Sequence, residues 1–168
     1  MSKALFVTRH DISVFTSANG NIDSDKILPF INQAQEIHMQ NYLGTDLYVR
    51  LQNDIQGGTL TGDYLELLQK YLKPMLLQWS MVEYLPFAGI NISNSGIYTK
   101  NPENSTPLTR KDVDKLIERT RTTAQYYTNR FIDFMQNNAA SKFPEYYSNS
   151  QEDVYPDDVA NFGGWVMS

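Results

Sequence analysis

The chain has 168 residues, of which 41% are hydrophobic and 20% charged, an ordinary composition for one folded domain with its own core. Its formal net charge of -5 provides no overall positive field, which argues against a protein that coats nucleic acid. The absence of cysteine excludes disulfides, thiolate catalysis and cysteine-based zinc sites. No stretch is apolar and long enough to predict a signal peptide or a membrane span, so we expect synthesis in the cytoplasm.

Residues 1–22 are expected to form an N-terminal segment with one strand or turn, ending in the loop Asn19-Gly20-Asn21. Asp23-Ser24-Asp25 then offers three possible helix caps. Apolar residues at helical spacing predict a helix from Lys26 to Leu43, with Pro29 in or just after its first turn. The inward positions of this helix are Ile27, Phe30, Ile31, Ala34, Ile37 and Tyr42.

Gly44 is suited to the left-handed conformation that ends such a helix. Thr45 can accept a backbone N–H and begin a second helix, which we expect to run to about Ile55 and to stop at Gly57-Gly58. Its inward residues would be Leu47, Leu51 and Ile55.

A third helix is predicted from Thr61 and Asp63 to Leu85-Pro86, and it would form the centre of the core. Pro74 lies inside it, removes one backbone donor and clashes with the carbonyl four residues earlier. We therefore expect this helix to kink or split at Pro74.

Two short extended runs follow, Ile90-Asn91-Ile92 and Ile97-Tyr98-Thr99. They flank Asn94-Ser95-Gly96, a turn that requires positive φ. The pattern predicts a β-hairpin near residues 90–99.

The longest predicted helix begins at the capping sequence Thr109-Arg110-Lys111-Asp112 and ends near Asn137-Asn138. Its apolar stripe consists of Val113, Leu116, Ile117, Thr120, Ala124, Tyr127, Phe131, Phe134 and Met135. Charged residues such as Lys111, Glu118 and Arg121 occupy mostly the other faces. The fold class that follows is mainly α: a small bundle of about four helices within residues 23–138, with a short hairpin and extended terminal arms.

Residues 139–168 show no periodicity and are expected to form an extended C-terminal arm. Such a segment either wraps its own domain or extends to a neighbour, where aromatic side chains supply much of the contact energy. Together with the hairpin, it provides the predicted protein-interface residues, which are Asn94, Ser95, Gly96, Ile97, Tyr98, Tyr146, Tyr147, Tyr155, Phe162 and Trp165.

No residue set predicts catalysis, a metal site or a cofactor. His10 and His38 lack partners at metal-ligand spacing, and no nucleophile, base and orienting group can be assembled. A small hydrolase or lyase therefore ranks last. The main alternative function is DNA binding through a helix-turn-helix around Gly44, whose reading helix would present Asp46, Tyr48, Arg50, Gln52 and Asn53. With one basic residue among acids and amides, two packed helices are the preferred interpretation.

The run from Ile27 to Ile37, followed by Tyr42-Leu43-Gly44-Thr45-Asp46-Leu47-Tyr48, resembles the head–tail connector (adaptor) proteins of tailed bacteriophages. The likeness continues through Tyr71-Leu72-Lys73-Pro74 and residues 92–97, and its order of elements spans Asp23 to Asn138. It is closest to the versions in phages of Bacteroides-type hosts, including crAss-like phages.

The resemblance implies a structural virion protein made in the bacterial cytoplasm, with no catalytic activity and no membrane contact. Subunits of such proteins form a ring of about 12 copies at the head–tail junction, beneath the portal protein. The ring offers a platform to the next tail or ring protein and extends the channel through which DNA passes without specific binding.

Overall fold

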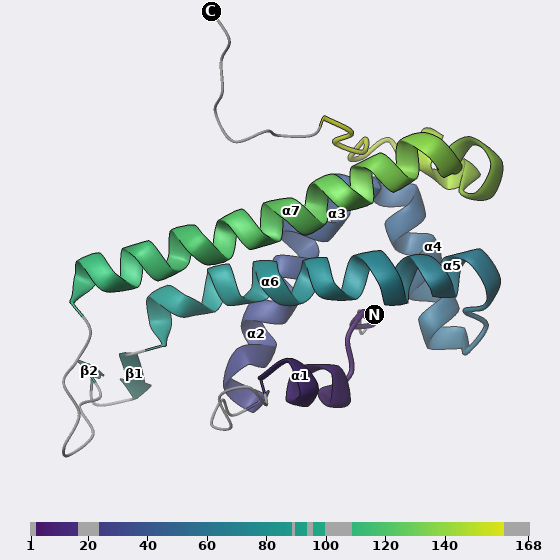
Figure 1. Ribbon diagram of the computed structural model, residues 1–168. Coiled ribbons are helices and arrows are strands. Elements are labelled where there is room, and N and C mark those ends of the chain that lie inside the picture. The colour runs from purple at the N-terminus through teal and green to yellow at the C-terminus, as the bar shows by residue number, and fades with distance from the viewer. Residues whose placement is uncertain (1–2, 17–23, 89, 94–95, 100–108, 160–168) are drawn as a thin grey trace, which may run out of the picture.

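A computed structural model describes residues 3–16, 24–88, 90–93, 96–99 and 109–159, and the fold is mainly α-helical (Figure 1). The α-helices are α1 (Arg9–Thr16), α2 (Ser24–Ala34), α3 (Gln40–Leu43), α4 (Thr45–Gly57), α5 (Gly62–Leu67), α6 (Lys73–Tyr84) and α7 (Arg110–Lys142). The π-helical turns are η1 (Gln35–Met39) and η2 (Leu68–Leu72), and the 3₁₀ turns are η3 (Leu85–Phe87) and η4 (Pro144–Tyr147).

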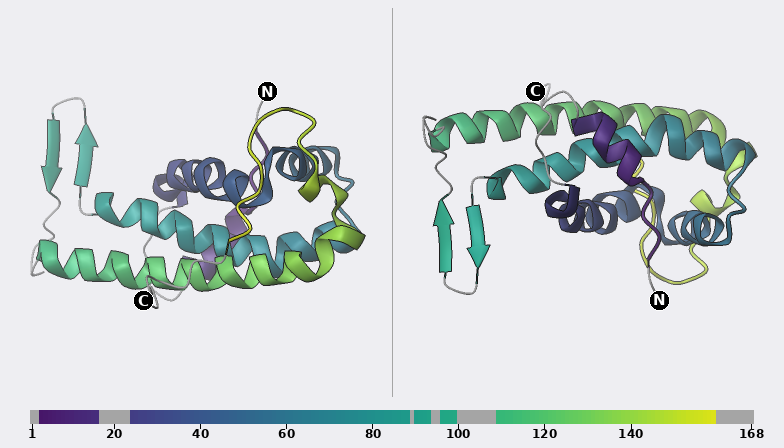
Figure 2. Two further views of the ribbon diagram at one scale, coloured as in Figure 1. Left: turned by 90° about the horizontal axis from the view of Figure 1, so that it is seen from above. Right: turned by 90° about the horizontal axis from the view of Figure 1, so that it is seen from below.

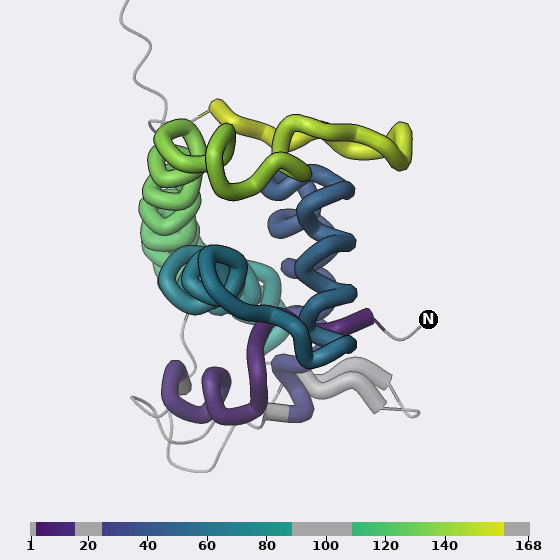
Figure 3. Tube along the Cα trace, turned by 90° about the vertical axis from the view of Figure 1, so that its right-hand side faces the viewer, coloured from purple at the N-terminus to yellow at the C-terminus, as the bar shows by residue number. Residues whose placement is uncertain are grey.

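The longest helix, α7, packs against α6 along the length of α6, and α2 crosses α6 on another side (Figures 1 and 2). Viewed along this pair, α1 and the segment after α7 lie on opposite sides of the bundle (Figure 3). The first half of α7 and the end of α6 extend past the other helices, so the molecule is elongated along α7 (Figure 2). None of the described helices is both long and apolar enough to span a bilayer.

The N-terminal segment is helical at α1, so the predicted strand or turn is wrong there. Thr8 and Asp11 form a reciprocal capping box: the Asp11 N–H donates to Thr8 Oγ1 at 3.2 Å, and the Thr8 N–H donates to Asp11 Oδ2 at 2.7 Å. The spacing Thr-x-x-Asp is a known helix-start signal. Ile12, which is 1% exposed, then attaches α1 to the core.

The helix predicted over Lys26–Leu43 is confirmed, although it contains the π turn η1. A π turn inserts one residue into the helix and rotates everything after it relative to the preceding turns. Ile37, predicted to face inward, is 53% exposed, whereas the side chain of Gln35 is fully buried. Pro29 lies early in the second turn of α2, just after the first turn, as predicted.

The interruption expected at Pro74 takes the form of the π turn η2 directly before α6. Pro74 cannot donate to the Lys70 carbonyl four residues earlier. Arg130 of α7 donates to that carbonyl instead, through a long 3.5 Å hydrogen bond from Nη1. The guanidinium also lies over the ring of Tyr71, with 4.9 Å between Cζ and the ring centroid.

Two short strands follow η3, namely β1 (Ile90–Ser93) and β2 (Gly96–Thr99). They pair antiparallel, with Ile90 opposite Thr99 and Ser93 opposite Gly96. Two residues of the predicted turn, Asn94 and Ser95, lie outside the described residues.

The helix predicted from Thr109 is confirmed as α7, and the Thr109 side chain accepts a hydrogen bond from the Asp112 N–H at 3.2 Å. It ends at Lys142, where the N–H of the following Phe143 still donates to the Ala139 carbonyl. The predicted boundary between domain and arm after residue 138 therefore falls inside a continuous helix.

Candidate interaction surfaces

The chain after α7 folds back onto its own domain. Phe143 is fully buried and Tyr146, in the 3₁₀ turn η4, is 4% exposed, so both side chains belong to the hydrophobic core. Burial raises the pKa of Tyr146, and its hydroxyl has no hydrogen-bond partner among the described residues. Tyr146 was predicted as an anchor for a neighbouring subunit, and this prediction is wrong because its ring packs within its own chain.

Residues 148–159, called the docked arm below, are held by the start of α4. The Thr45 N–H donates to the Val154 carbonyl at 2.9 Å, and the Val154 N–H donates to Thr45 Oγ1 at 3.1 Å. Further along, the Asp157 N–H donates to the Asn41 carbonyl at 2.9 Å. Thr45 was expected to cap α4, but its hydroxyl oxygen binds the arm instead.

Asp46 holds the beginning of the docked arm. Its Oδ2 accepts hydrogen bonds from Ser148 Oγ at 2.6 Å and from the Ser150 N–H at 2.7 Å. These two donors stabilise the carboxylate and lower the pKa of Asp46. The arm is therefore fixed by backbone and charge-assisted hydrogen bonds that a purely hydrophobic pattern does not reveal.

The outer face of this region remains exposed. Tyr147 is 60% exposed, Tyr155 67% and Val159 64%. The docked arm contains four acidic side chains, Glu152, Asp153, Asp157 and Asp158. None of them forms an ion pair with a described residue. Phe162 and Trp165, the other predicted anchors, lie outside the described residues.

The first half of α7 forms a second exposed surface. No side chain between Arg110 and Thr123 is fully buried, and Leu116, which was predicted to face inward, is 42% exposed. Lys111, Lys115 and Arg119 follow one another at intervals of four residues, so they form a single line along the helix, called the basic row below. All three are exposed, and none forms an ion pair with a described residue.

The basic row was not predicted from the sequence, where Lys111 was placed with other charged residues on the faces away from the apolar stripe and Lys115 and Arg119 were not considered. The i, i+4, i+8 spacing of three cations was the available signal. The predicted hairpin residues Gly96, Ile97 and Tyr98 lie in β2. That strand follows η3, well away from the docked arm (Figure 1).

His38 is part of an internal polar contact rather than a ligand site. Its ring stacks on Trp79 at 4.0 Å between centroids, and its Nε2 lies 2.9 Å from Glu83 Oε1. Burial lowers the pKa of His38, with Glu83 opposing the shift and Arg121 adding to it.

This arrangement predicts a pH dependence of stability. Below the ordinary histidine pKa of about 6.5 the unfolded chain binds a proton that the folded chain resists, so the free energy of unfolding falls as the pH drops below that value. When urea unfolding is measured at about pH 7.5 and about pH 5.5, the free energy of unfolding should fall less between the two pH values for His38→Gln than for the wild type. His10→Gln, at an exposed position of α1, is the control and should lose as much as the wild type. Equal losses in all three proteins would contradict the prediction.

Helix α4 does not present the face that a DNA-reading helix needs. Tyr48 is 3% exposed and Asp46 8%, because they face the core and the docked arm. Arg50 is engaged by Asp54 at 2.8 Å and by Glu145 at 3.7 Å. Most of the candidate base contacts predicted from sequence are therefore covered or already paired.

A cleft of about 400 Å³ lies between α1 and the η2–α6 junction, and Tyr127 of α7 also lines it. Lys73 and Asp11 form an ion pair of 2.8 Å at this place, and each is about one-fifth exposed. Within the described residues, no group of three or more histidine, aspartate or glutamate side chains is arranged to hold a metal ion.

A family model matches residues 39–155. The chain belongs to DUF6712, a family of unknown function. No curated protein and no solved structure matches the chain. The DUF6712 region contains both α4 and the part of the docked arm that Thr45 and Asp46 hold, whereas α1 and α2 precede it. In this DUF6712 protein residues 148–155 of the docked arm thus lie within the family's matched region, and residues 156–159 follow it.

Proposed function

We propose that the chain is a structural subunit of a ring at the head–tail junction of a tailed bacteriophage, joining the portal protein to the next tail or ring protein. Two features support the proposal. One is the ordered resemblance from Asp23 to Asn138. The other is a pair of separate exposed surfaces, each carrying hydrophobic side chains and unpaired charges, on the docked arm and on the first half of α7.

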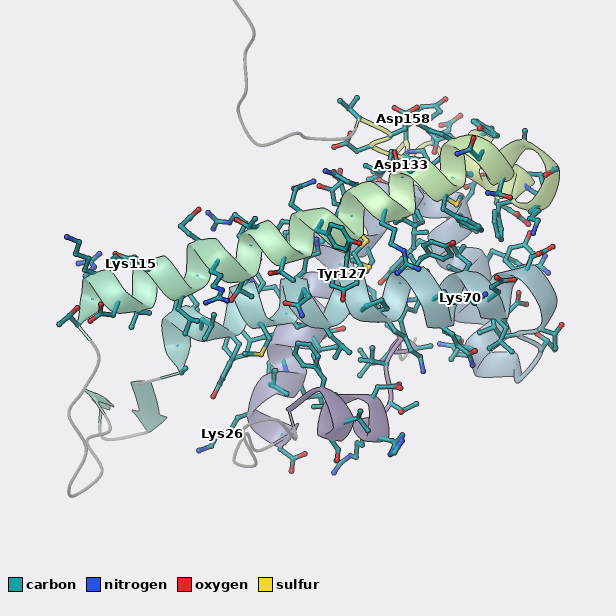
Figure 4. The ribbon with its side chains drawn as sticks, in the orientation of Figure 1. Lys26, Lys70, Lys115, Tyr127, Asp133 and Asp158 are labelled. Carbon is teal, nitrogen blue, oxygen red and sulfur yellow. The ribbon has the colours of Figure 1, made fainter. Side chains whose placement is uncertain are left out.

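The position of these two surfaces is the observation that carries the proposal. A closed ring of identical subunits requires two different contact patches on each subunit, arranged so that one copy's first patch meets the next copy's second patch. Lys115 and Asp158 mark the two surfaces toward opposite ends of α7 (Figure 4). A monomeric enzyme has no need for such a pair, and exposed apolar patches rimmed by charge are typical of protein interfaces.

The proposed ring has about 12 copies by resemblance, surrounds a channel for DNA and functions within the virion. Its role is mechanical, so no substrate or cofactor is part of the proposal. The net charge of -5 suits a channel wall that does not retain DNA, because like charges repel.

Electron microscopy of the protein mixed with the portal protein of the same genome tests the proposal. We expect rings of this protein stacked on the portal ring. Particles that show only the portal, at concentrations where both proteins are in excess, would contradict it. A gel-shift series at low salt checks the DNA-binding alternative, since specific and salt-sensitive duplex binding would favour a regulator over a ring subunit.

A further inference from the structure

Building on the proposed ring, we propose that neighbouring copies are joined by one specific contact: the docked arm of one copy binds the basic row on α7 of the next copy. The partner surface is thus a second copy of this chain. The inference rests on charge, on exposed side chains and on the distance between the two surfaces within one molecule.

The charges of the two surfaces are complementary. The docked arm contains four acidic residues and no lysine or arginine, and the basic row contains three cations. Cations spaced four residues apart on a helix repel one another. Among the described residues, no acid forms an ion pair with the row: Glu118 is paired with Arg121 at 2.7 Å, and Asp112 accepts a hydrogen bond from Thr109 Oγ1. An acidic partner from outside the chain relieves this repulsion.

Both surfaces also carry exposed hydrophobic side chains beside the charges. Leu116 follows Lys115 and lies one helical turn before Arg119 and Thr120, and Tyr126 is 64% exposed two turns beyond Arg119. On the arm, Tyr155 lies between the two acidic pairs and is 67% exposed. Tyrosine is enriched at protein interfaces because it combines a large apolar ring with a hydrogen-bonding tip.

The contact cannot form within one molecule. Gln136 Nε2 donates to the Asp158 carbonyl at 3.3 Å, which places the end of the docked arm beside the later part of α7. Lys115 lies 21 residues before Gln136 on the same helix, a separation of about 30 Å at the α-helical rise. The hydrogen bonds of Thr45, Asp46 and Asn41 with the arm hold its other residues at the start of α4. A second copy must therefore supply the acidic partner, and the contact is head-to-tail.

Cysteine cross-linking tests this geometry directly, because the chain contains no cysteine of its own. The full-length variant Leu116→Cys/Tyr155→Cys, mixed with portal and oxidised mildly, should give a ladder of linked species on a non-reducing gel. Each single variant, Leu116→Cys or Tyr155→Cys, should give no ladder. A two-fold symmetric contact would instead link the double variant into dimers only, without higher species, and that result would overturn the proposal, as would a double variant that stays unlinked.

Charge reversal in the cysteine pair provides a second readout. Lys115→Glu/Arg119→Glu should reduce the linked product about tenfold, since like charges then face each other. Glu152→Lys/Asp158→Lys should do the same, and all four changes together should restore linkage. Lys26→Glu, an exposed change on α2, is the control and should leave the ladder intact. Loss of linkage in the control, or no recovery in the fourfold variant, would contradict the charge pairing.

The cross-links and the micrographs separate the two proposals. Rings on the portal without 116–155 links would overturn this contact and leave the ring intact. Links without a ring on the portal would overturn the proposed function and keep the head-to-tail contact. Circular dichroism of each variant confirms that the subunit is folded before either result is interpreted.

Discussion

Gly44→Ala should lower the free energy of unfolding by roughly 3 kcal/mol and release the docked arm from α4. Gly44 has φ 74° and ψ 157°, a backbone conformation that is essentially restricted to glycine. A Cβ at this position would lie 2.7 Å from Cδ and 2.8 Å from Cγ of Pro156, so the arm would have to move. Hydrogen exchange should then become faster at the Val154 and Asp157 amides, whose acceptors are Thr45 Oγ1 and the Asn41 carbonyl.

Gly58→Ala is the matched control for backbone strain. Gly58 also has positive φ, at 65°, but no atom lies within 4 Å of the added Cβ. Gly58→Ala should lower the free energy of unfolding by about 1 kcal/mol and leave hydrogen exchange in the docked arm unchanged. Pro156→Ala should recover part of the loss when combined with Gly44→Ala, because it removes the two ring atoms that clash. If Gly44→Ala and Gly58→Ala lowered the free energy of unfolding equally, and hydrogen exchange in the docked arm stayed unchanged, the attachment of the arm would not depend on Gly44.

The long helices were predictable because their apolar residues repeat at the α-helical period. Helix α7 could be located from Thr109 and its apolar stripe, and the helix through Leu43 from Ile27 onward. The π turn at Gln35 could not be predicted this way, since a local insertion leaves the composition of the helix unchanged and only rotates its faces. As a result Ile37, which is 53% exposed, was assigned inward, and the fully buried Gln35 was absent from the predicted inward positions.

The candidate surfaces were predictable only in part. Exposed aromatic residues such as Tyr147 and Tyr155 were identified by their lack of periodicity, and the same argument wrongly included the buried Tyr146. Periodicity cannot separate these cases, because η4 is a short 3₁₀ turn that returns Phe143 and Tyr146 to the core. What fixes the arm is the hydrogen bonding of Thr45 and Asp46 to residues about one hundred positions later, a pairing that single-sequence patterns do not contain.

Gln35 holds the N-terminal segment to the body of the protein, and this contact is the basis of the second large effect. Its Oε1 accepts from the Phe6 N–H at 2.7 Å, and its Nε2 donates to the Ala4 carbonyl at 2.8 Å and to the Tyr48 hydroxyl at 3.3 Å. The side-chain amide of Gln35 thus makes hydrogen bonds to the backbone of Ala4 and Phe6, as the backbone of a neighbouring strand would. Phe6, only 1% exposed, then packs on Tyr48 with 5.4 Å between ring centroids.

Gln35→Leu should therefore lower the free energy of unfolding by roughly 3 kcal/mol, because it leaves the buried Phe6 N–H without an acceptor and removes two further hydrogen bonds. Gln33→Leu is the matched control: the same substitution two residues earlier, at an exposed side chain whose contact to Glu83 is 3.4 Å, should change stability by less than about 0.5 kcal/mol. Urea unfolding of both variants measures the difference. If Gln35→Leu cost no more than Gln33→Leu, the N-terminal segment would have to be held by its hydrophobic side chains alone, and the π turn at Gln35 would then have no role in attaching it.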